Sequence, residues 1–358
     1  MARDVHPPQV TTGAKSAMMA GGPAGPIVAI VGCGVVGARI AEVLASAGAR
    51  IALLDTRADV ADSVARAVGG VRIDLAEASH ADIVVLAHPA PQAPTAAKFL
   101  LAGVPVVSMS DDVDDVRDLL ELDPLAVQHG VTLVVGAAMA PGLSGLLARL
   151  LAGQMHEVDE IHVAMHGTGG PACARQHHRA LGGTSIGLHD GEWIRRPAGA
   201  GRELCWFPEP INSYDCYRAE MPDPLLLNRV FPGVGRMSAR MSATRRDRFT
   251  AQLPMLSPPH KEGGIGALRV DVRGSLANGA RETLIAGVAV RSGIAAAVVA
   301  ATVTRWLLDA GASDPGVLIL GDVRLPTADL LDGIRASGVQ LFEFSGISRP
   351  AAPEPDDD

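Results

Sequence analysis

The stretch from Ile27 to Gly37 reads IVAIVGCGVVG, and it decides the fold. Its first five residues are all apolar, which is typical of a strand buried on both faces of a parallel sheet. Three glycines follow, Gly32, Gly34 and Gly37, with the spacing GxGxxG. In a strand–turn–helix unit these glycines provide the tight turn, the approach to a pyrophosphate and close helix packing. The stretch therefore predicts a Rossmann unit that binds a dinucleotide.

A helix is expected directly after this turn. Residues 37–47 place their apolar side chains at helical spacing, and Gly48 closes the segment. The unpaired N–H groups at the start of a helix attract phosphates. We therefore expect Val35 and Val36 to contact the cofactor together with the three glycines.

The second strand, Arg50–Leu54, ends at Asp55, 18 residues after Gly37. An acidic residue about 20 residues after the glycines accepts hydrogen bonds from the adenosine ribose of NAD and repels the 2′-phosphate of NADP. Arg57 is a complication, because an arginine at this place accommodates that phosphate. We predict NAD or NADP as cofactor, with NAD favoured, and with Asp55, Thr56 and Arg57 at the ribose.

The first half of the chain alternates strand-like and helix-like segments, which predicts βαβ units and a doubly wound parallel sheet. After about Met155 the apolar residues alternate with polar ones, as in an antiparallel sheet with one exposed face. Residues 199–259 are rich in proline and are expected to be irregular, whereas Ile294–Leu308 predicts a helix that returns to the first domain. The expected division is a flexible leader at 1–25, a Rossmann domain at 26–150 plus about 291–346, an inserted α+β substrate and dimerisation domain at 151–290, and a disordered acidic tail at 347–358.

Composition excludes several classes of protein. The net charge of −8 argues against a nucleic-acid binder, which needs a basic face. The uncharged run Ser292–Thr304 is too short for a membrane span of about 20 residues. The four cysteines have no metal-ligand spacing, so no metal is expected. The first residues do not resemble a secretory signal, which predicts a cytoplasmic protein, and the exposed sheet face predicts a homodimer.

Ligands of open α/β sheets lie beyond the carboxyl ends of the strands. Three predicted loops meet this condition, and all are expected near the nicotinamide. They carry His88 and Pro89, then Ser110 with Asp111 and Asp112, and then Pro141 and Gly142. Asp112 is a catalytic candidate, but an N-cap of the next helix is an equally good interpretation.

These segments together resemble the saccharopine dehydrogenase-like oxidoreductases. The resemblance rests on GCGVVG, VVLAHPAP, LLAGVPVVSMSDD and especially AMAPGLSGLLA, and continues through VDEIHVAMHGTGGPA and CWFPEPINSYDCY. It implies an N-terminal Rossmann domain, an inserted α+β domain and a C-terminal return helix. It also implies NAD(P)-linked hydride transfer at a carbon–nitrogen bond of an amino acid, imine or polyamine.

The second half contributes four further catalytic candidates. His177 and His178 titrate near neutral pH, and neighbouring helical residues do not share a face, so at most one is expected in the site. Tyr214 and Asp215 lie in the proline-rich region, where packing is the alternative interpretation. Two other functions stay open: a transferase or lyase that retains NAD through an internal redox cycle, similar to homospermidine synthase, and a non-catalytic NAD-binding protein.

Overall fold

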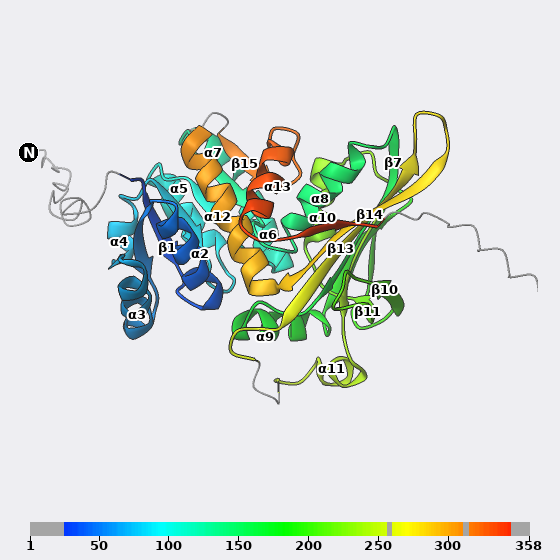
Figure 1. Cartoon of the computed structure of the whole chain (residues 1–358), viewed down its shortest axis with the longest axis horizontal. Coiled ribbons are helices and arrows are strands. Elements are labelled where there is room, and N and C mark those ends of the chain that lie inside the picture. Colours follow the sequence, from blue (N-terminus) through cyan, green and yellow to red (C-terminus); the bar gives the residue numbers. More distant parts are fainter. Residues whose placement is uncertain (1–24, 256–259, 311–314, 345–358) are drawn as a thin grey trace, which may run out of the picture.

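The computed structural model describes residues 25–255, 260–310 and 315–344. The predicted acidic tail and all but the last residue of the predicted leader lie outside these ranges. Two sheets form the described part, one on each side of Figure 1, with α12 and α13 between them.

The first sheet is the predicted doubly wound parallel sheet, in the order β15-β6-β5-β4-β1-β2-β3. The chain leaves the central β1 toward β2 and β3 and then crosses to β4 on the other side, so the strand order reverses between β1 and β4. Such a switch point is where open α/β sheets bind their ligands. Its strands are β1 (Ile27–Val31), β2 (Arg50–Leu54), β3 (Val71–Arg72), β4 (Ile83–Leu86), β5 (Val106–Ser108), β6 (Thr132–Val135) and β15 (Gly316–Ile319).

The helices of the first half follow the strands, as the alternating pattern predicts. The helix after β1 buries Ile40, Ala41 and Leu44, the apolar face expected from the spacing. These helices are α2 (Val35–Ser46), α3 (Ala58–Val68), α4 (Leu75–Ala78), α5 (Ala93–Leu101), α6 (Val113–Leu120), α7 (Asp123–Gln128) and α8 (Leu143–Ala152).

The second sheet is mixed, in the order β10-β11-β12-β7-β13-β14-β16, with β8 and β9 attached to β12. One face of its central strands is packed into the main core through Ile161, Val163 and Val270. Its strands are β7 (Glu157–His166), β8 (Thr184–His189), β9 (Glu192–Pro197), β10 (Glu203–Trp206), β11 (Ser213–Arg218), β12 (Arg236–Ser242), β13 (Ile265–Ser275), β14 (Arg281–Arg291) and β16 (Leu341–Glu343).

Two expectations about this half of the chain are corrected. Residues 199–259 are not generally irregular, because β10, β11, α10, β12 and α11 lie there. The prolines stand where proline is tolerated, for example Pro208 between two strands and Pro224 in the first turn of α10. In addition, β16 pairs with β14 and so belongs to the second sheet, not to the Rossmann domain. The remaining helices are α9 (Pro171–Ala180), α10 (Asp223–Val230), α11 (Arg245–Thr250), α12 (Ser292–Ala310) and α13 (Thr327–Ala336).

The long apolar helix α12 joins the two halves. It runs across the centre of Figure 1, where it packs on α2 and α13 and follows directly from β14. Among the described helices it alone is long and apolar enough to cross a membrane, but most of it is buried inside the protein. Its apolar composition is therefore accounted for by its place in the core.

Candidate functional site

The glycine turn after β1 has the geometry that its sequence predicts. Gly32 has φ +101°, and a Cβ atom there would lie 2.6 Å from the backbone nitrogen of His88. A Cβ atom on Gly37 would overlap the carbonyl oxygen of Gly32, whereas one on Gly34 would meet nothing within 4 Å. The open space at Gly34, where α2 begins, is the place at which a pyrophosphate would approach the backbone.

Asp55 is tied to this turn. One of its oxygens accepts a hydrogen bond from the N–H of Cys33 at 2.8 Å, and the other accepts from the N–H of Arg57 at 2.9 Å. Burial alone would raise the pKa of Asp55, but these two N–H groups and the Arg57 charge hold it below its ordinary value. Thr56 lies beside the same carboxylate. The ionised carboxylate therefore lies at the end of β2, where the adenosine ribose is expected.

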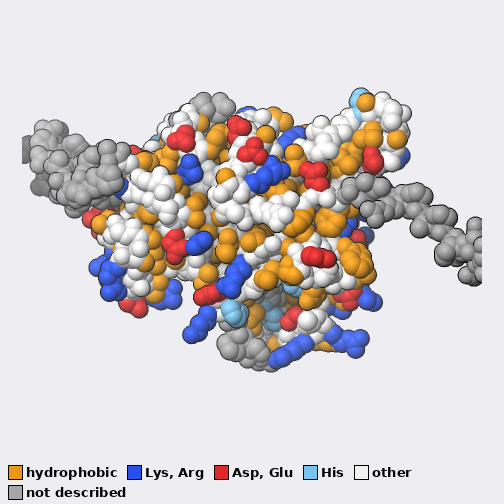
Figure 2. Space-filling view, viewed as in Figure 1, with side chains coloured by type: hydrophobic (Ala, Val, Ile, Leu, Met, Phe, Trp, Pro, Cys, Tyr) orange, Lys and Arg blue, Asp and Glu red, His pale blue; other side chains and the backbone are white. Residues whose placement is uncertain are grey.

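A cavity of about 140 Å³ opens at the switch point between β1 and β4. Its walls come from α2, from the loops after β4, β5 and β6, and from α9 of the second domain. Figure 2 shows histidine side chains at the surface in the region where Figure 1 places α9. The polar and charged residues that line the cavity include His88, Asp111, Cys173, Gln176, His177 and Arg179.

Three of these residues, Asp111, Cys173 and His177, converge and are called the trio below. Cys173 and His177 are four residues apart on α9 and so share one helical face. His177 Nε2 lies 3.4 Å from Cys173 Sγ and 3.6 Å from Asp111 Oδ2. Burial alone would lower the pKa of His177, but Cys173 and Asp111 raise it to about 10. Cys173 and Asp111 thus favour a positive charge on the side chain of His177.

Two buried polar atoms of the cavity wall have no hydrogen-bond partner among the described residues, His88 Nε2 and Ser292 Oγ. The other ring nitrogen of His88 lies 2.8 Å from the carbonyl oxygen of Pro89 and must donate to it. Nε2 is then an acceptor for a ligand. Buried polar atoms are rarely left unsatisfied, so both atoms point to a bound molecule in this cavity.

Several predicted residues lie around the cavity without facing it. Asp112 caps α6 by accepting hydrogen bonds from two backbone N–H groups, and it also accepts from the side chain of Gln176. The N-cap interpretation is thus confirmed, and the second role of Asp112 is to position Gln176. Ser110 is buried and donates to Asp115, so the structure contradicts its predicted contact with the cofactor.

The loop after β6 also differs in detail from the prediction. Ala138, Met139 and Ala140 line the cavity, whereas Pro141 and Gly142 lie behind them. The reason is that the loop folds back on itself, with the N–H of Ala138 bonded to the carbonyl of Pro141. The prediction that Pro141 and Gly142 contact the cofactor directly is therefore corrected. They support the part of the loop that lines the cavity.

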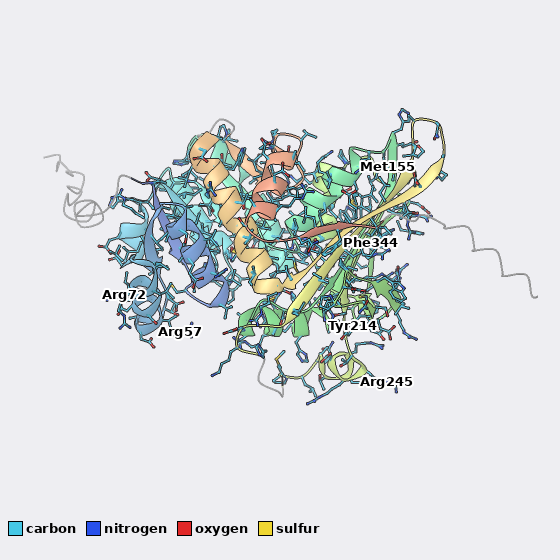
Figure 3. The ribbon with its side chains drawn as sticks, viewed as in Figure 1. Arg57, Arg72, Met155, Tyr214, Arg245 and Phe344 are labelled. Atoms are coloured by element: carbon cyan, nitrogen blue, oxygen red, sulfur yellow. The ribbon has the colours of Figure 1, made fainter. Side chains whose placement is uncertain are left out.

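Three catalytic candidates lie outside the cavity. His178 points away and donates to the carbonyl oxygen of Thr250 at 2.9 Å, as expected for a neighbour of His177 that faces another direction. Tyr214 stacks on His166 in the second sheet, far from the turn that carries Arg57 (Figure 3). Asp215 forms an ion pair with Arg202 at 2.9 Å. Tyr214 is nevertheless exposed, so it is not part of the small buried cluster around Phe207 that the packing interpretation predicts.

Sequence reasoning missed Cys173, Arg179 and the buried Asp223 as site residues. The four-residue spacing of Cys173 and His177 was visible, but nothing local connects α9 with Asp111 after β5. Asp223 accepts a hydrogen bond from Ser144 at 2.6 Å, behind the cavity, and burial raises its pKa to about 6.

Comparison with known proteins agrees with this geometry. Residues 27–111 match the family model described as NADP oxidoreductase coenzyme F420-dependent. Myo-inositol dehydrogenase Hyg17 of Streptomyces leeuwenhoekii is 29% identical over 180 residues, which are 47% of this chain. The match spans only 54% of the length of that curated relative.

The similarity in structure extends further. Apo saccharopine dehydrogenase (L-Glu forming) of Saccharomyces cerevisiae superimposes with a TM-score of 0.69, over 90% of this chain and 100% of that chain, at 14% identity. At this identity the similarity establishes the fold. The chain therefore has the fold of saccharopine dehydrogenase, and its N-terminal domain is of the type found in NAD(P)-dependent oxidoreductases.

Proposed function

We propose that this chain is an NAD(P)-dependent oxidoreductase that acts on a carbon–nitrogen bond of a small substrate. The cavity at the switch point carries the proposal. The cavity is continuous with the glycine turn through Val36 and His88, and it contains the trio. Two buried polar atoms in its wall have no hydrogen-bond partner among the described residues and could bind a ligand. A nicotinamide placed there would lie between the first domain and α9. A small-molecule substrate, a cytoplasmic location and a homodimer remain part of the proposal.

The proposed reaction requires the protein mainly to position the substrate and the cofactor relative to each other. In the oxidative direction a bound NAD(P)⁺ would accept a hydride, with its two electrons, from a substrate carbon. The substrate nitrogen would release a proton to solvent, so that the products would be an imine and NAD(P)H. The cofactor carries the redox chemistry, while the protein orients the substrate and the ring. The substrate nitrogen lies against the trio in this arrangement.

Arg179 supports an amino-acid-type substrate. This exposed residue lines the rim of the cavity, its guanidinium donates to Gln176 at 2.6 Å, and it has no ion pair among the described residues. Arginine binds carboxylates through two parallel hydrogen bonds. We therefore assign to Arg179 the role of binding the carboxylate of the substrate.

The test follows nicotinamide absorbance while amino acids, polyamines and pairs of oxo acids with amines are offered to the protein with NAD and NADP. Once a substrate is found, Arg179→Ala is expected to raise KM by about 10–100-fold, because a hydrogen bond to a charged group contributes about 1.5–3 kcal/mol. Arg175→Ala, an exposed arginine on the same helix, is the matched control and should leave KM unchanged.

Other outcomes contradict the proposal in different ways. If the cofactor co-purifies tightly and product forms without net formation of NAD(P)H, the protein is the NAD-retaining transferase or lyase. Firm nucleotide binding without any turnover, and no effect of His177→Ala on that binding, points to a non-catalytic NAD-binding protein.

A further inference from the structure

We propose that the trio is a binding site for one Zn²⁺ ion, whose open coordination position faces the substrate cavity. The role of the ion in binding substrate rests on the proposed function. The ion site itself is inferred from the geometry of the trio alone. Its members come from two parts of the chain, Asp111 from the loop after β5 and the other two from α9.

The distances within the trio match a metal site. A tetrahedral zinc ion with a thiolate about 2.3 Å away and nitrogen and oxygen ligands about 2.0–2.2 Å away holds its ligand atoms roughly 3.3–3.6 Å from one another. The distances from His177 Nε2 to Cys173 Sγ and to Asp111 Oδ2, 3.4 Å and 3.6 Å, fall in this range, and all three ligand atoms lie within 4.8 Å of one another. The two distances from His177 Nε2 thus fit a shared ion, and the third pair of atoms is close enough to complete the site after a small adjustment.

An ion pair of His177 with Asp111 accounts for one of the two contacts of Nε2 but not for both. A single hydrogen on His177 Nε2 points in one direction, whereas both Cys173 Sγ and Asp111 Oδ2 face this nitrogen. The 3.6 Å distance to the carboxylate is also too long for a hydrogen bond. One cation in the centre contacts all three atoms at once, so it satisfies each of them.

The chemistry of the donors selects zinc. Thiolate, imidazole and carboxylate are its usual ligands, whereas calcium and magnesium prefer oxygen alone. With one thiolate and one carboxylate the complex of Zn²⁺ is neutral, which suits a site where His177 is buried. Three protein ligands with the fourth position open is the pattern of catalytic rather than structural zinc sites.

The open position gives the ion a role in the proposed reaction. All three ligands line the cavity, so the substrate nitrogen would occupy the fourth position. A metal-bound donor atom loses its proton more readily, as zinc-bound water does. The ion would thus promote release of the proton to water. In this arrangement His177 acts as a metal ligand. It does not act as the general acid or base that was predicted from the sequence.

Cobalt is the probe that tests the site, because a thiolate bound to Co²⁺ gives a strong near-ultraviolet absorption. Chelator-treated full-length protein is titrated with Co²⁺ and then with Zn²⁺. We expect this absorption at one Co²⁺ per chain and its loss when Zn²⁺ displaces the cobalt. Cys173→Ser should abolish it, and Asp111→Asn should weaken Co²⁺ binding at least about 10-fold.

Two matched variants are the controls. Cys205→Ser changes a buried cysteine of the second sheet, and Asp112→Asn changes the neighbouring carboxylate that caps α6. Both should keep the cobalt absorption. Circular dichroism of every variant shows whether it is folded. Absence of the absorption in wild-type protein, or its persistence in Cys173→Ser, overturns the zinc site.

NADH fluorescence in the same samples separates this proposal from the proposed function. If chelated protein binds NADH and turns over but gives no cobalt absorption, the zinc site is wrong and the oxidoreductase stands. If the cobalt absorption forms but no nicotinamide nucleotide binds, the oxidoreductase is wrong and the metal site stands.

Discussion

Asp55 is the residue that we expect to distinguish the two possible cofactors. Its carboxylate, held by the N–H groups of Cys33 and Arg57, is placed to accept hydrogen bonds from a ribose and to repel a 2′-phosphate. Asp55→Ala is therefore expected to lower NADH affinity by about 10–100-fold, while NADPH affinity stays equal or rises. Fluorescence titration of both nucleotides measures this change.

The control for this variant is Asp62→Ala, which breaks an exposed ion pair with Arg72 away from the turn. It should leave both affinities unchanged. The opposite result is that wild-type protein binds NADPH much more tightly than NADH and that Asp55→Ala has the same two affinities. This result would show that Asp55 does not contact the ribose and that Arg57 binds the 2′-phosphate instead.

At the scale of elements, the turn between β1 and α2 depends on glycine for two separate reasons. Gly32 and Gly48 both have φ near +90 to +100°, but only at Gly32 would a Cβ atom also collide with backbone, that of Ala87 and His88. We expect Gly48→Ala to lower the free energy of unfolding by about 1 kcal/mol through strain alone. Gly32→Ala should lower it by more and also abolish NADH binding.

Urea unfolding and NADH titration of both variants test this expectation. The comparison is informative because the two glycines share the same backbone region and differ in what surrounds them. Equal losses of stability, with NADH binding retained in Gly32→Ala, would contradict the assignment of this turn to the cofactor.

Most strands of the first sheet were predictable from the sequence, β15 being an exception, whereas in the second sheet only the alternating pattern of β7, β13 and β14 was. Buried parallel strands such as β1 and β2 are mostly apolar runs that end at glycine or a charged residue, and the predicted bounds of these two agree with the structure. Strands β10 and β11 carry exposed residues such as Leu204 and Tyr214, and prolines stand between them. A short, half-exposed strand bordered by prolines has no local pattern that separates it from a loop.

The same limit applies to the site. The glycine turn and Asp55 lie close together in sequence, so spacing alone identified them. The trio exists only because α9 packs against the loop after β5, a contact between two domains that no local periodicity encodes. Residue type alone selected both His177 and His178, and helical spacing predicted that at most one of them enters the site, with no preference between them. The structure shows that His177 is the one that faces the cavity.

At the scale of the whole molecule, the two domains are held together by a core that runs beneath the cavity. Helix α12 packs on α2, while α8 contacts β13 and β14 of the second sheet. Asp223 belongs to this junction, since it lies at the start of α10 and accepts a hydrogen bond from Ser144 on α8. Its side chain is buried, and Oδ2 has no partner among the described residues. Its charge must therefore affect global stability.

The sign of this effect follows from its pKa. Burial raises the pKa of Asp223 from 3.8 to about 6 in the folded state, so the folded protein binds the proton more tightly than the unfolded chain. Below about pH 4 both states are protonated and nothing is lost. Between about pH 4 and 6 the free energy of unfolding falls as pH rises, by on the order of 2–3 kcal/mol in total from this group.

Asp223→Asn removes this pH dependence, since an amide accepts the same hydrogen bond from Ser144 without a charge. Relative to wild type, the variant is expected to gain stability between pH 4.5 and pH 7, by about 2 kcal/mol. Urea unfolding at both pH values measures the gain, with Asp329→Asn, an exposed carboxylate in the first turn of α13, as the control. A difference between variant and wild type that stays constant across this range would mean that Asp223 is ionised in the folded protein at both pH values. Its negative charge would then be stabilised in the folded protein, and burial would not raise its pKa.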